Sequence, residues 1–431
     1  MPSRSAVFSP VDHEVRARLG AEVAWGAIDP KLDAAIGKLL AQPIDRDTAV
    51  RIALARNQRL QARYEQLGIA ASEVAEATVL PPTEVDFDYK RALDGAGSET
   101  EISVIQDVLA LLQIGQRRAS ATAELDAARA RAVEATVELA MQVELRFYDH
   151  VAAQQELALD RTAFETAVAS AELTERQHAA GNVTDLALAR EQEQRERLRV
   201  EVSRAEQRVA DTRAALAAIL GLDAKSSWST VATLPPVPAN APKLDGLDRA
   251  ASANLDAAAL RAEADAAAAR HRTAVVRAFV PTLGAGVAAA RRDDGEWEVG
   301  PAIRIGIPLF DRQQGARARA RAEQRRATRE LAATELELGA EVAAARSRVT
   351  KAFAEARQLG DVVLPLRKRV LDETVLHYNA MNATPFELLI ARRDMVDISR
   401  ELVDAQRRYW RAVAEARALE RGGRVRTEES P

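Results

Sequence analysis

The pattern of hydrophobic and polar positions changes its period along the chain. In the segment 303–307 isoleucine occupies every second position, with Arg304 and Gly306 between, which is typical of a strand with one apolar and one polar face. From Ala316 the sequence becomes ARARARAEQRRATRELAATELELGAEV, which consists of good helix formers. The pattern therefore predicts a short strand that leads into a very long helix.

The same succession of patterns occurs twice, with an offset of 200 residues. The matching landmarks are Pro81 and Pro281, Gly115 and Gly315, and Asn182 and Asn382. Three landmarks with one offset indicate an internal structural repeat.

The repeat predicts a division of the chain into five parts. They are an N-terminal extension at 1–46, a first repeat at 47–221, a Pro-rich connector at 222–247, a second repeat at 248–421 and a tail at 422–431. The first repeat is expected to hold a helix at about 47–78, a β-hairpin at 83–109, a long helix at 116–178 and a helix at 185–220. The second is expected to hold a helix at about 248–278, a β-hairpin at 283–308, a long helix at 316–378 and a helix at 385–420. The predicted fold class is mainly α with two β-hairpins.

A heptad pattern in the long helices predicts helix-on-helix packing. In the second half its members are Leu331, Leu338, Ala345, Ala352, Leu359 and Leu366. On the heptads alone, an ordinary antiparallel coiled coil is the favoured interpretation. Pro365 lies inside this helix and is expected to kink it or to interrupt its hydrogen bonding.

Each predicted hairpin has one apolar and one charged face. The residues expected on the apolar face of the last strand are Trp297, Val299, Ile303, Ile305 and Ile307. Four such strands cannot close on themselves in lipid, so we expect several subunits to pool them. A water-exposed small sheet that caps a coiled coil remains the alternative.

Composition narrows the choice of function classes. The chain of 431 residues has no cysteine, which excludes disulfides and thiolate metal sites, and its net charge of −4 gives no reason to expect a nucleic-acid partner. The five histidines are scattered, and no catalytic, cofactor-binding or metal-binding set stands out. We therefore expect a protein that is not an enzyme.

Several segments resemble the TolC family of outer-membrane channel proteins. They are GPAIRIGIPLFDRQQG (300–315), AGNVTDLAL (180–188), HYNAMNATPFELL (377–389) and RRYW (407–410). Three of these stretches, namely PLFDRQQG, HYNAMNATPFELL and RRYW, resemble the heavy-metal efflux branch of the family, the CzcC-like channels, more than the multidrug branch. The resemblance covers about 45–420.

The resemblance implies a homotrimer with a 12-stranded β-barrel in the outer membrane and an α-helical barrel across the periplasm. It implies a passive exit duct of a tripartite efflux system, which passes metal ions or small toxic solutes. The implied partners are a periplasmic adaptor and a proton-driven inner-membrane pump. The competing interpretation is a soluble coiled-coil scaffold protein.

By the same resemblance, the turns between the helices form the periplasmic tip where the adaptor docks. The residues implied there are Gly181, Asn182, Thr184, Asp185, Asn382, Thr384 and Pro385. Charges beside the turns are candidates for gating, namely Glu175, Arg176, Asp372, Glu373, Glu387, Arg392 and Asp394. The apolar strand face implied to meet lipid is the set Trp297, Val299, Ile303, Ile305 and Ile307.

The beginning of the sequence departs from the family pattern. The segment MPSRSAVFSPVDHEVRARLG has no apolar core and no cleavage site of an export signal. Family members carry such a signal, so we expect that this chain starts after it or from a mis-set start codon. Non-export is the alternative. The sequence contains no run of about 18 apolar residues, so it predicts no transmembrane helix.

Overall fold

The structure is a computed structural model of the chain. It describes residues 3–23, 25–26, 30–91, 98–223, 226–279, 282–291, 295–306 and 314–425. The predicted end of the second hairpin, Ile307 and Pro308, lies outside these residues, as does most of the predicted tail.

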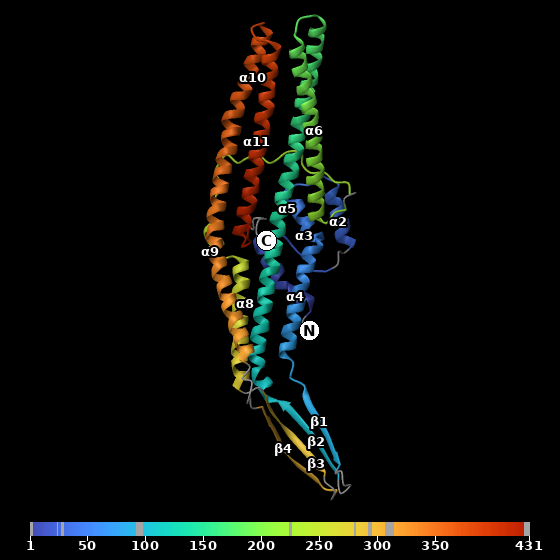
Figure 1. The fold of residues 1–431 in the computed structure, drawn as a ribbon, viewed down its shortest axis with the longest axis vertical. Helices are drawn as coiled ribbons and strands as arrows, with labels where there is room; N and C mark the ends of the chain where they lie inside the picture. The colour runs from blue at the N-terminus through green and yellow to red at the C-terminus, as the bar shows by residue number, and fades with distance from the viewer. Residues whose placement is uncertain are drawn as a thin grey trace. The chain divides into compact units, whose positions relative to one another are not determined.

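Helices and one sheet make up the described residues (Figure 1). In the first half the elements are α1 (Arg4–Leu19), α2 (Pro30–Leu40), α3 (Arg46–Arg56), α4 (Gln58–Thr78), β1 (Thr83–Arg91), β2 (Ser98–Asp107), α5 (Val108–Ala179) and α6 (Asp185–Leu220). In the second half they are α7 (Leu247–Ala250), α8 (Leu255–Phe279), β3 (Leu283–Arg291), β4 (Trp297–Ile305), α9 (Gln314–Gln358), the π-helical turn η1 (Leu359–Val363), α10 (Leu364–Asn379) and α11 (Pro385–Glu420). The order helix, two strands, long helix, helix thus occurs twice.

The first long helix begins earlier than expected. It was predicted at 116–178, but α5 starts at Val108, directly after β2. The carboxylate of Asp107 accepts a hydrogen bond from the Ala110 backbone N–H at 2.9 Å, as an N-cap does. Gly115 therefore lies inside the helix and does not mark a junction.

The predicted helix at 47–78 is two helices. The division is at Asn57, whose side chain accepts a hydrogen bond from the Leu60 N–H and donates one to the Ile219 carbonyl, both at 3.0 Å. Asn57 thereby caps α4 and holds it to the end of α6.

Two other predicted boundaries also differ from the structure. The extension at 1–46 contains the helices α1 and α2. The helix expected at 248–278 is divided into α7 and α8 at Asn254, which is buried and donates hydrogen bonds to the carbonyls of Gly422 and Gly423.

The interruption expected at Pro365 is confirmed. Proline cannot donate the backbone hydrogen bond that an α-helix requires at this position. The π-helical turn η1 forms directly before this proline, and the Leu364 N–H donates a hydrogen bond to the Leu359 carbonyl, five residues back. The second long helix is therefore α9, η1 and α10 in succession.

The chain forms two compact units, and each takes segments from both halves of the sequence. Unit 1 comprises Met1–Glu14, Arg63–Val133 and Leu255–Glu337. Unit 2 comprises Val15–Ala62, Glu134–Asn254 and Leu338–Pro431.

Unit 1 contains a four-stranded antiparallel sheet in the order β1-β2-β3-β4. The two hairpins meet between β2 and β3, where Val104 pairs with Val287, and Val104 also pairs with Val85 of β1. β1 and β4 are the edge strands, and each has nine residues.

The helical part of unit 1 is held together by alanine packing and polar contacts. α8 buries Ala259, Ala266 and Ala269, whose small side chains allow helices to approach closely. Arg270 of α8 pairs with Glu124 of α5 at 2.5 Å, and Arg261 pairs with Glu335 of α9 at 2.6 Å.

Aromatic side chains form the core of unit 2. The ring of Trp410 stacks on Tyr148, with centroids 5.8 Å apart, and meets Tyr409 edge-on at 5.0 Å. The Trp410 indole N–H donates to the Pro235 carbonyl at 2.8 Å, which fixes the connector to α11. Among the residues that the structure describes, none of the helices combines the length and apolar content needed to cross a bilayer.

Candidate functional site

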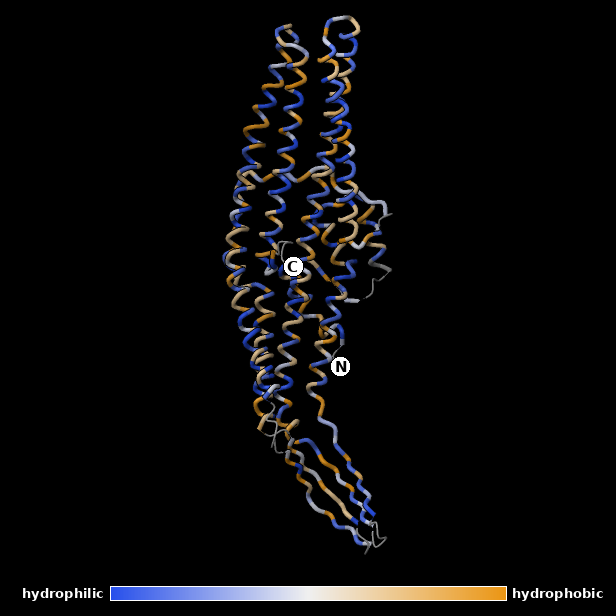
Figure 2. The backbone as a smooth tube through the Cα atoms, in the orientation of Figure 1, coloured by the Kyte–Doolittle hydropathy of each residue, from blue (hydrophilic) through white to orange (hydrophobic). Residues whose placement is uncertain are grey.

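The sheet of unit 1 has one apolar and one polar face. Paired residues of an antiparallel sheet lie on the same face, so the register assigns every side chain. Val85 and Phe87 of β1 share a face with Val299 and Ile303 of β4. Phe87 and Ile303 are 67% and 71% exposed. Figure 2 shows the alternation of hydrophobic and hydrophilic residues along these strands.

The predicted apolar residues of the last strand lie as the sequence indicates. Trp297, Val299, Ile303 and Ile305 all belong to the exposed apolar face, together with Pro301. Ile307 lies outside the described residues. Contact of this face with lipid stays a prediction.

The opposite face carries an ion-pair group that spans the sheet. Arg304 of β4 pairs with Glu84 and with Asp86 of β1, the latter at 2.5 Å. Ser103 of β2 also donates a hydrogen bond to Asp86 at 3.4 Å. The intervening positions on β3 are Gly284 and Gly286, so no side chain of β3 stands between the partners here.

The turn between α5 and α6 ends one helix and begins the next by standard chemistry. Gly181 has φ of +76°, and the Asn182 N–H bonds the Gln177 carbonyl at 2.9 Å, which completes a Schellman motif. Thr184 is the N-cap of α6, and its hydroxyl accepts a hydrogen bond from the Ala187 N–H. His178 and Asp185 contact each other at 2.6 Å across the turn.

The turn between α10 and α11 has the same backbone plan. The Asn382 N–H bonds the His377 carbonyl at 2.8 Å. Thr384 is the N-cap, Pro385 opens α11, and Glu387 completes a capping box with Thr384. Hydrogen bonds from Thr384 lower the pKa of the Glu387 carboxyl below its usual range.

Sequence reasoning missed Met381. It occupies the position of Gly181 in the second turn and has φ of +60°, a value that L side chains rarely adopt. Its side chain is 94% exposed. No sequence rule predicts a methionine here, because glycine or asparagine would fit the backbone without strain.

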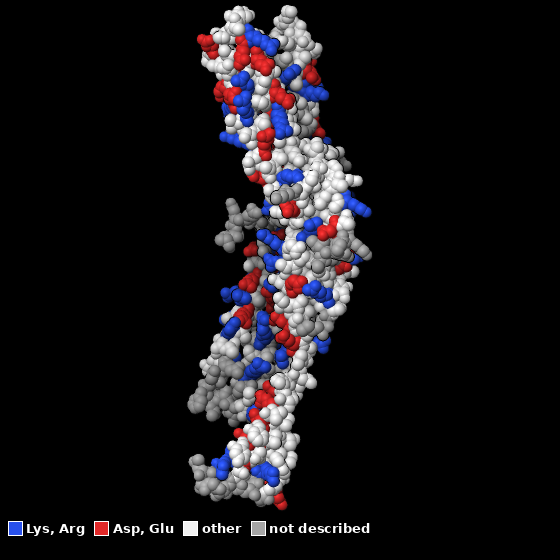
Figure 3. All heavy atoms as spheres, turned by 90° about the vertical axis from the view of Figure 1, so that its right-hand side faces the viewer, with Lys and Arg blue, Asp and Glu red and all other residues white. Residues whose placement is uncertain are grey.

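The charges proposed for gating have ordinary surroundings in the structure. Glu175 contacts Arg195 of α6 at 3.6 Å, Arg176 contacts Glu172 at 3.8 Å, and Asp394 pairs with Arg367 of α10 at 2.8 Å. Asp372, Glu373 and Arg392 are exposed. Each of these ion pairs lies within one helical hairpin. Figure 3 shows charged side chains of both signs interspersed over the helices.

A second charged feature, not predicted, is a ladder of ion pairs between α5 and α11 in unit 2. The three rungs are Glu144 with Arg417 and Arg421, Asp149 with Arg407 and Arg411, and Asp160 with Arg400. The residue numbers run in opposite directions on the two helices, so the helices are antiparallel along this ladder. Every acid comes from the first half of the chain, and the arginines named here come from the second; Arg46 and Arg208 of the first half also contact Glu144 and Asp160.

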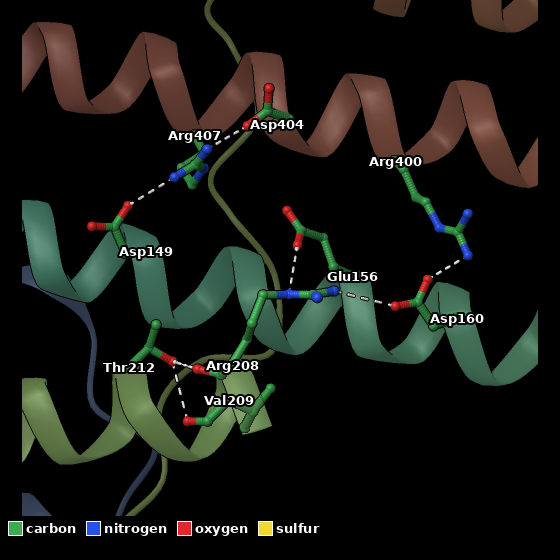
Figure 4. Close-up of polar contacts among 9 residues, drawn as sticks. All are labelled: Asp149, Glu156, Asp160, Arg208, Val209, Thr212, Arg400, Asp404 and Arg407. Carbon is green, nitrogen blue, oxygen red and sulfur yellow. Dashed lines mark hydrogen bonds and ion pairs between the residues drawn. The ribbon is translucent and has the colours of Figure 1, made fainter. Parts of the chain in front are cut away.

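The rung at Asp160 also includes α6. Asp160 is 4% exposed, and its carboxylate contacts Arg400 of α11 and, at 3.5 Å, Arg208 of α6 (Figure 4). In this view α5 lies between α11 and α6. A buried carboxylate with two guanidinium partners couples three helices, and its removal leaves Arg208 with Glu156 and Arg400 with Asp397 as their remaining acidic partners.

A cavity of about 590 Å³ adjoins this rung. It is lined by charged residues such as Glu156, Asp160 and Arg400 and by apolar residues such as Phe386, Leu389 and Ile390. Burial raises the pKa of the Glu156 carboxyl, although Arg407 and Arg208 oppose the shift. Within the described part of the chain, no group of three or more acidic or histidine side chains is arranged to hold a metal ion.

His150 is a buried neutral histidine of unit 2. Its Nδ1 lies 3.0 Å from the Thr212 hydroxyl, and its Nε2 lies 3.2 Å from the Gln154 amide nitrogen. Thr212 itself donates to the Arg208 carbonyl, which assigns the imidazole proton to Nδ1. Burial, assisted by the charge of Arg213, lowers the pKa of His150 to about 4.

A periodicity in the sequence could have revealed the ladder. Arg400 and Arg407 are seven residues apart on α11, and Asp149 and Asp160 are eleven residues apart on α5, so each pair lies on one face of its helix. Opposite charges on two such faces indicate paired helices. Neither charge pattern by itself predicts which helix is the partner.

Comparisons with known proteins agree with this architecture. No protein-family profile matches the chain. The cobalt-zinc-cadmium resistance protein CzcC of Cupriavidus metallidurans is 24% identical over 383 residues, which are 86% of each chain.

Two solved structures are similar over nearly their whole length. The outer membrane protein VceC of Vibrio cholerae has a TM-score of 0.72 and 18% identity, with 88% of this chain and 96% of that chain covered. The CmeC outer membrane channel of Campylobacter jejuni has a TM-score of 0.70 and 12% identity, with 95% and 92% covered.

The fold is therefore that of the TolC-type outer-membrane channel proteins, and the resemblance to that family is confirmed. Within it, the chain is similar in sequence to a metal-resistance protein of the CzcC kind.

Proposed function

We propose that this chain is the outer-membrane channel component of a tripartite efflux system. It forms a passive exit duct for metal ions or small toxic solutes, as a homotrimer in the outer membrane with an extension into the periplasm. The partners are a periplasmic adaptor protein and a proton-driven inner-membrane pump. No catalytic role is part of this proposal.

One observation carries the proposal, namely an open sheet whose two faces suit two different surroundings. The apolar face, with Phe87 and Ile303, is exposed, and the other face carries Arg304 with its acidic partners. Both edges of the sheet are unpaired within the described residues. Such an arrangement is satisfied when copies join their edges, with the apolar face toward lipid and the polar face toward water.

The similarity to CzcC supports metal cations as the cargo, because that protein is named for resistance to cobalt, zinc and cadmium. We propose the turns at Gly181–Asp185 and Asn382–Pro385 as the adaptor-docking ends. The charges beside these turns are the proposed gating residues. Gating requires that these charges move relative to those of a neighbouring copy.

Reconstitution tests this function. The chain is produced with an export signal, purified from outer membranes in detergent, chemically crosslinked and added to a planar lipid bilayer. We expect crosslinked trimers and stepwise cation conductance. A chain that remains monomeric and water-soluble without detergent, and that gives no conductance, would instead be a coiled-coil scaffold.

A further inference from the structure

Two glycines bring β3 unusually close to β2. A Cβ atom at Gly286 would lie 1.8 Å from the Val104 carbonyl oxygen and 2.8 Å from the Ile105 Cα. A Cβ at Gly284 would lie 2.7 Å from the Ile105 Cγ2. Any other residue at 286 would therefore force the strands apart, which identifies a corner in the sheet where the two hairpins join.

The polar face is concave at this level. Neighbouring strands are about 4.8 Å apart, so β1 and β4, three strand spacings apart, would lie roughly 14 Å apart in a flat sheet. Side chains stand nearly perpendicular to a flat sheet and cannot easily meet over that span. Arg304 nevertheless contacts Glu84 and Asp86, so the sheet must curve toward this face.

The corner and the ion pairs lie at the same end of the sheet. Gly284 pairs with Arg304, and Gly286 lies between Ile105 and Ala302, in the row that begins with Glu84. This is the end at which α4 leads into β1 and β2 leads into α5. The curvature is thus fixed where the strands join the helices (Figure 1).

We propose that Gly284, Gly286, Arg304, Glu84 and Asp86 form a curvature lock, which sets the arc of each four-stranded sheet. The arc decides how many copies close a ring, because β4 of one copy must meet β1 of a second copy of this chain. The two edges suit each other, since both have nine residues and β1 is antiparallel to β4. Arg304 is a positioning residue in this assembly, and the inference rests on the proposed function.

Spin-label distances test the lock directly. The chain has no cysteine, so Val85→Cys and Ile303→Cys place two labels at exposed positions of the apolar face, one on each edge strand. The labelled chain is mixed with an excess of unlabelled chain, so that each assembly holds one pair. We expect one narrow distance distribution in the otherwise unchanged protein.

Arg304→Gln is expected to lengthen and widen that distribution and to lower the yield of crosslinked trimers several-fold. The charge reversal Arg304→Glu with Glu84→Arg and Asp86→Arg should restore both, which a general loss of folding would not allow. Gly286→Ala should abolish trimers. Arg291→Gln, on the other face of the same sheet, is the matched control and should change neither readout.

Unchanged distances and trimer yield in Arg304→Gln would overturn the lock. So would a reversal that restores neither, in a protein whose circular dichroism matches that of the unmodified chain. Failure of the unmodified chain to form trimers would contradict the proposed function instead, and the distance across the single sheet would still decide the lock.

Discussion

The two halves of the chain share one plan of elements but differ in chemistry at the same positions. Residues 200 apart can be compared directly. The clearest contrasts are Glu84 and Asp86 with Gly284 and Gly286, Asp149 and Asp160 with Val349 and Gly360, and Gly181 with Met381.

These differences are complementary. In the sheet the first half provides the two acids and the second provides Arg304. In the helices the first half provides Glu144, Asp149 and Asp160, and the second provides an arginine partner for each of them. The two halves have similar surfaces because they share one plan of elements. Since their charges are opposite at these positions, the surface of one half binds that of the other half and not a second copy of itself.

The largest effect is expected from the acid at the centre of the ladder. Asp160→Ala should lower the free energy of unfolding by about 3 kcal/mol, because Arg208 and Arg400 lose a buried anion. Denaturant unfolding of the detergent-solubilised protein measures the change. Glu165→Ala, at an exposed position of the same helix, should change it by less than about 0.5 kcal/mol. Equal losses in both variants would show that the ladder does not join the halves.

A pH titration sharpens the comparison at His150, whose counterpart Thr350 bonds only its own helix, at the Arg346 carbonyl. The folded-state pKa of about 4 is below the ordinary value of 6.5, so the folded protein favours the neutral ring. Stability is therefore unaffected above pH 6.5 and falls as the pH drops from 6.5 toward 4, by up to roughly 3 kcal/mol.

The control for that titration is His150→Gln. The difference in unfolding free energy between the variant and the unmodified protein should be constant above pH 7. Toward pH 4 the unmodified protein should lose stability relative to the variant, which has no imidazole to protonate. A constant difference over the whole range would mean that the pKa of His150 is the same in the folded and the unfolded protein.

Exchange of the turn residues tests the contrast between Gly181 and Met381. Met381→Gly should stabilise the second turn by about 1 kcal/mol, and Gly181→Met should destabilise the first by about as much, since a side chain at positive φ is strained. Amide hydrogen exchange at Asn382 and Asn182 reports each local opening. Effects of the same sign at both turns would contradict the assigned backbone.

The smallest expected difference between the two halves concerns the two caps. Thr384→Ala should cost about 1 kcal/mol, and Thr184→Ala about half of that, because only Thr384 takes part in a capping box. Hydrogen exchange in the first turns of α11 and α6 gives the comparison. Glu387→Gln keeps the capping hydrogen bond without the charge, so a changed conductance in that variant would support a gating role.

Local chemistry made much of the fold predictable. The alternating isoleucines at 303 and 305 define the two faces of β4, Pro365 forces a break in a helix, and Thr384 with Pro385 announces the start of α11. Each of these signals depends only on residues close in sequence.

Long-range partners were not predictable in the same way. The start of α5 depends on Asp107 acting as a cap, and nothing before Val108 distinguishes it from a strand residue. Arg304 and Asp86 are 218 residues apart, and only the curvature of the sheet brings them together. Met381 adopts a conformation that its own side chain disfavours.

The π-helical turn at Leu359–Val363 has a consequence for the heptads that run through it. One extra residue in a helical turn rotates everything after it by about 100° relative to an uninterrupted helix. Before the turn Leu338 and Ala345 of this heptad are buried, whereas beyond it Leu366 of the same heptad is about half exposed. A single inserted residue thus lets one continuous apolar repeat serve the chain's own interior first and an outside surface afterwards.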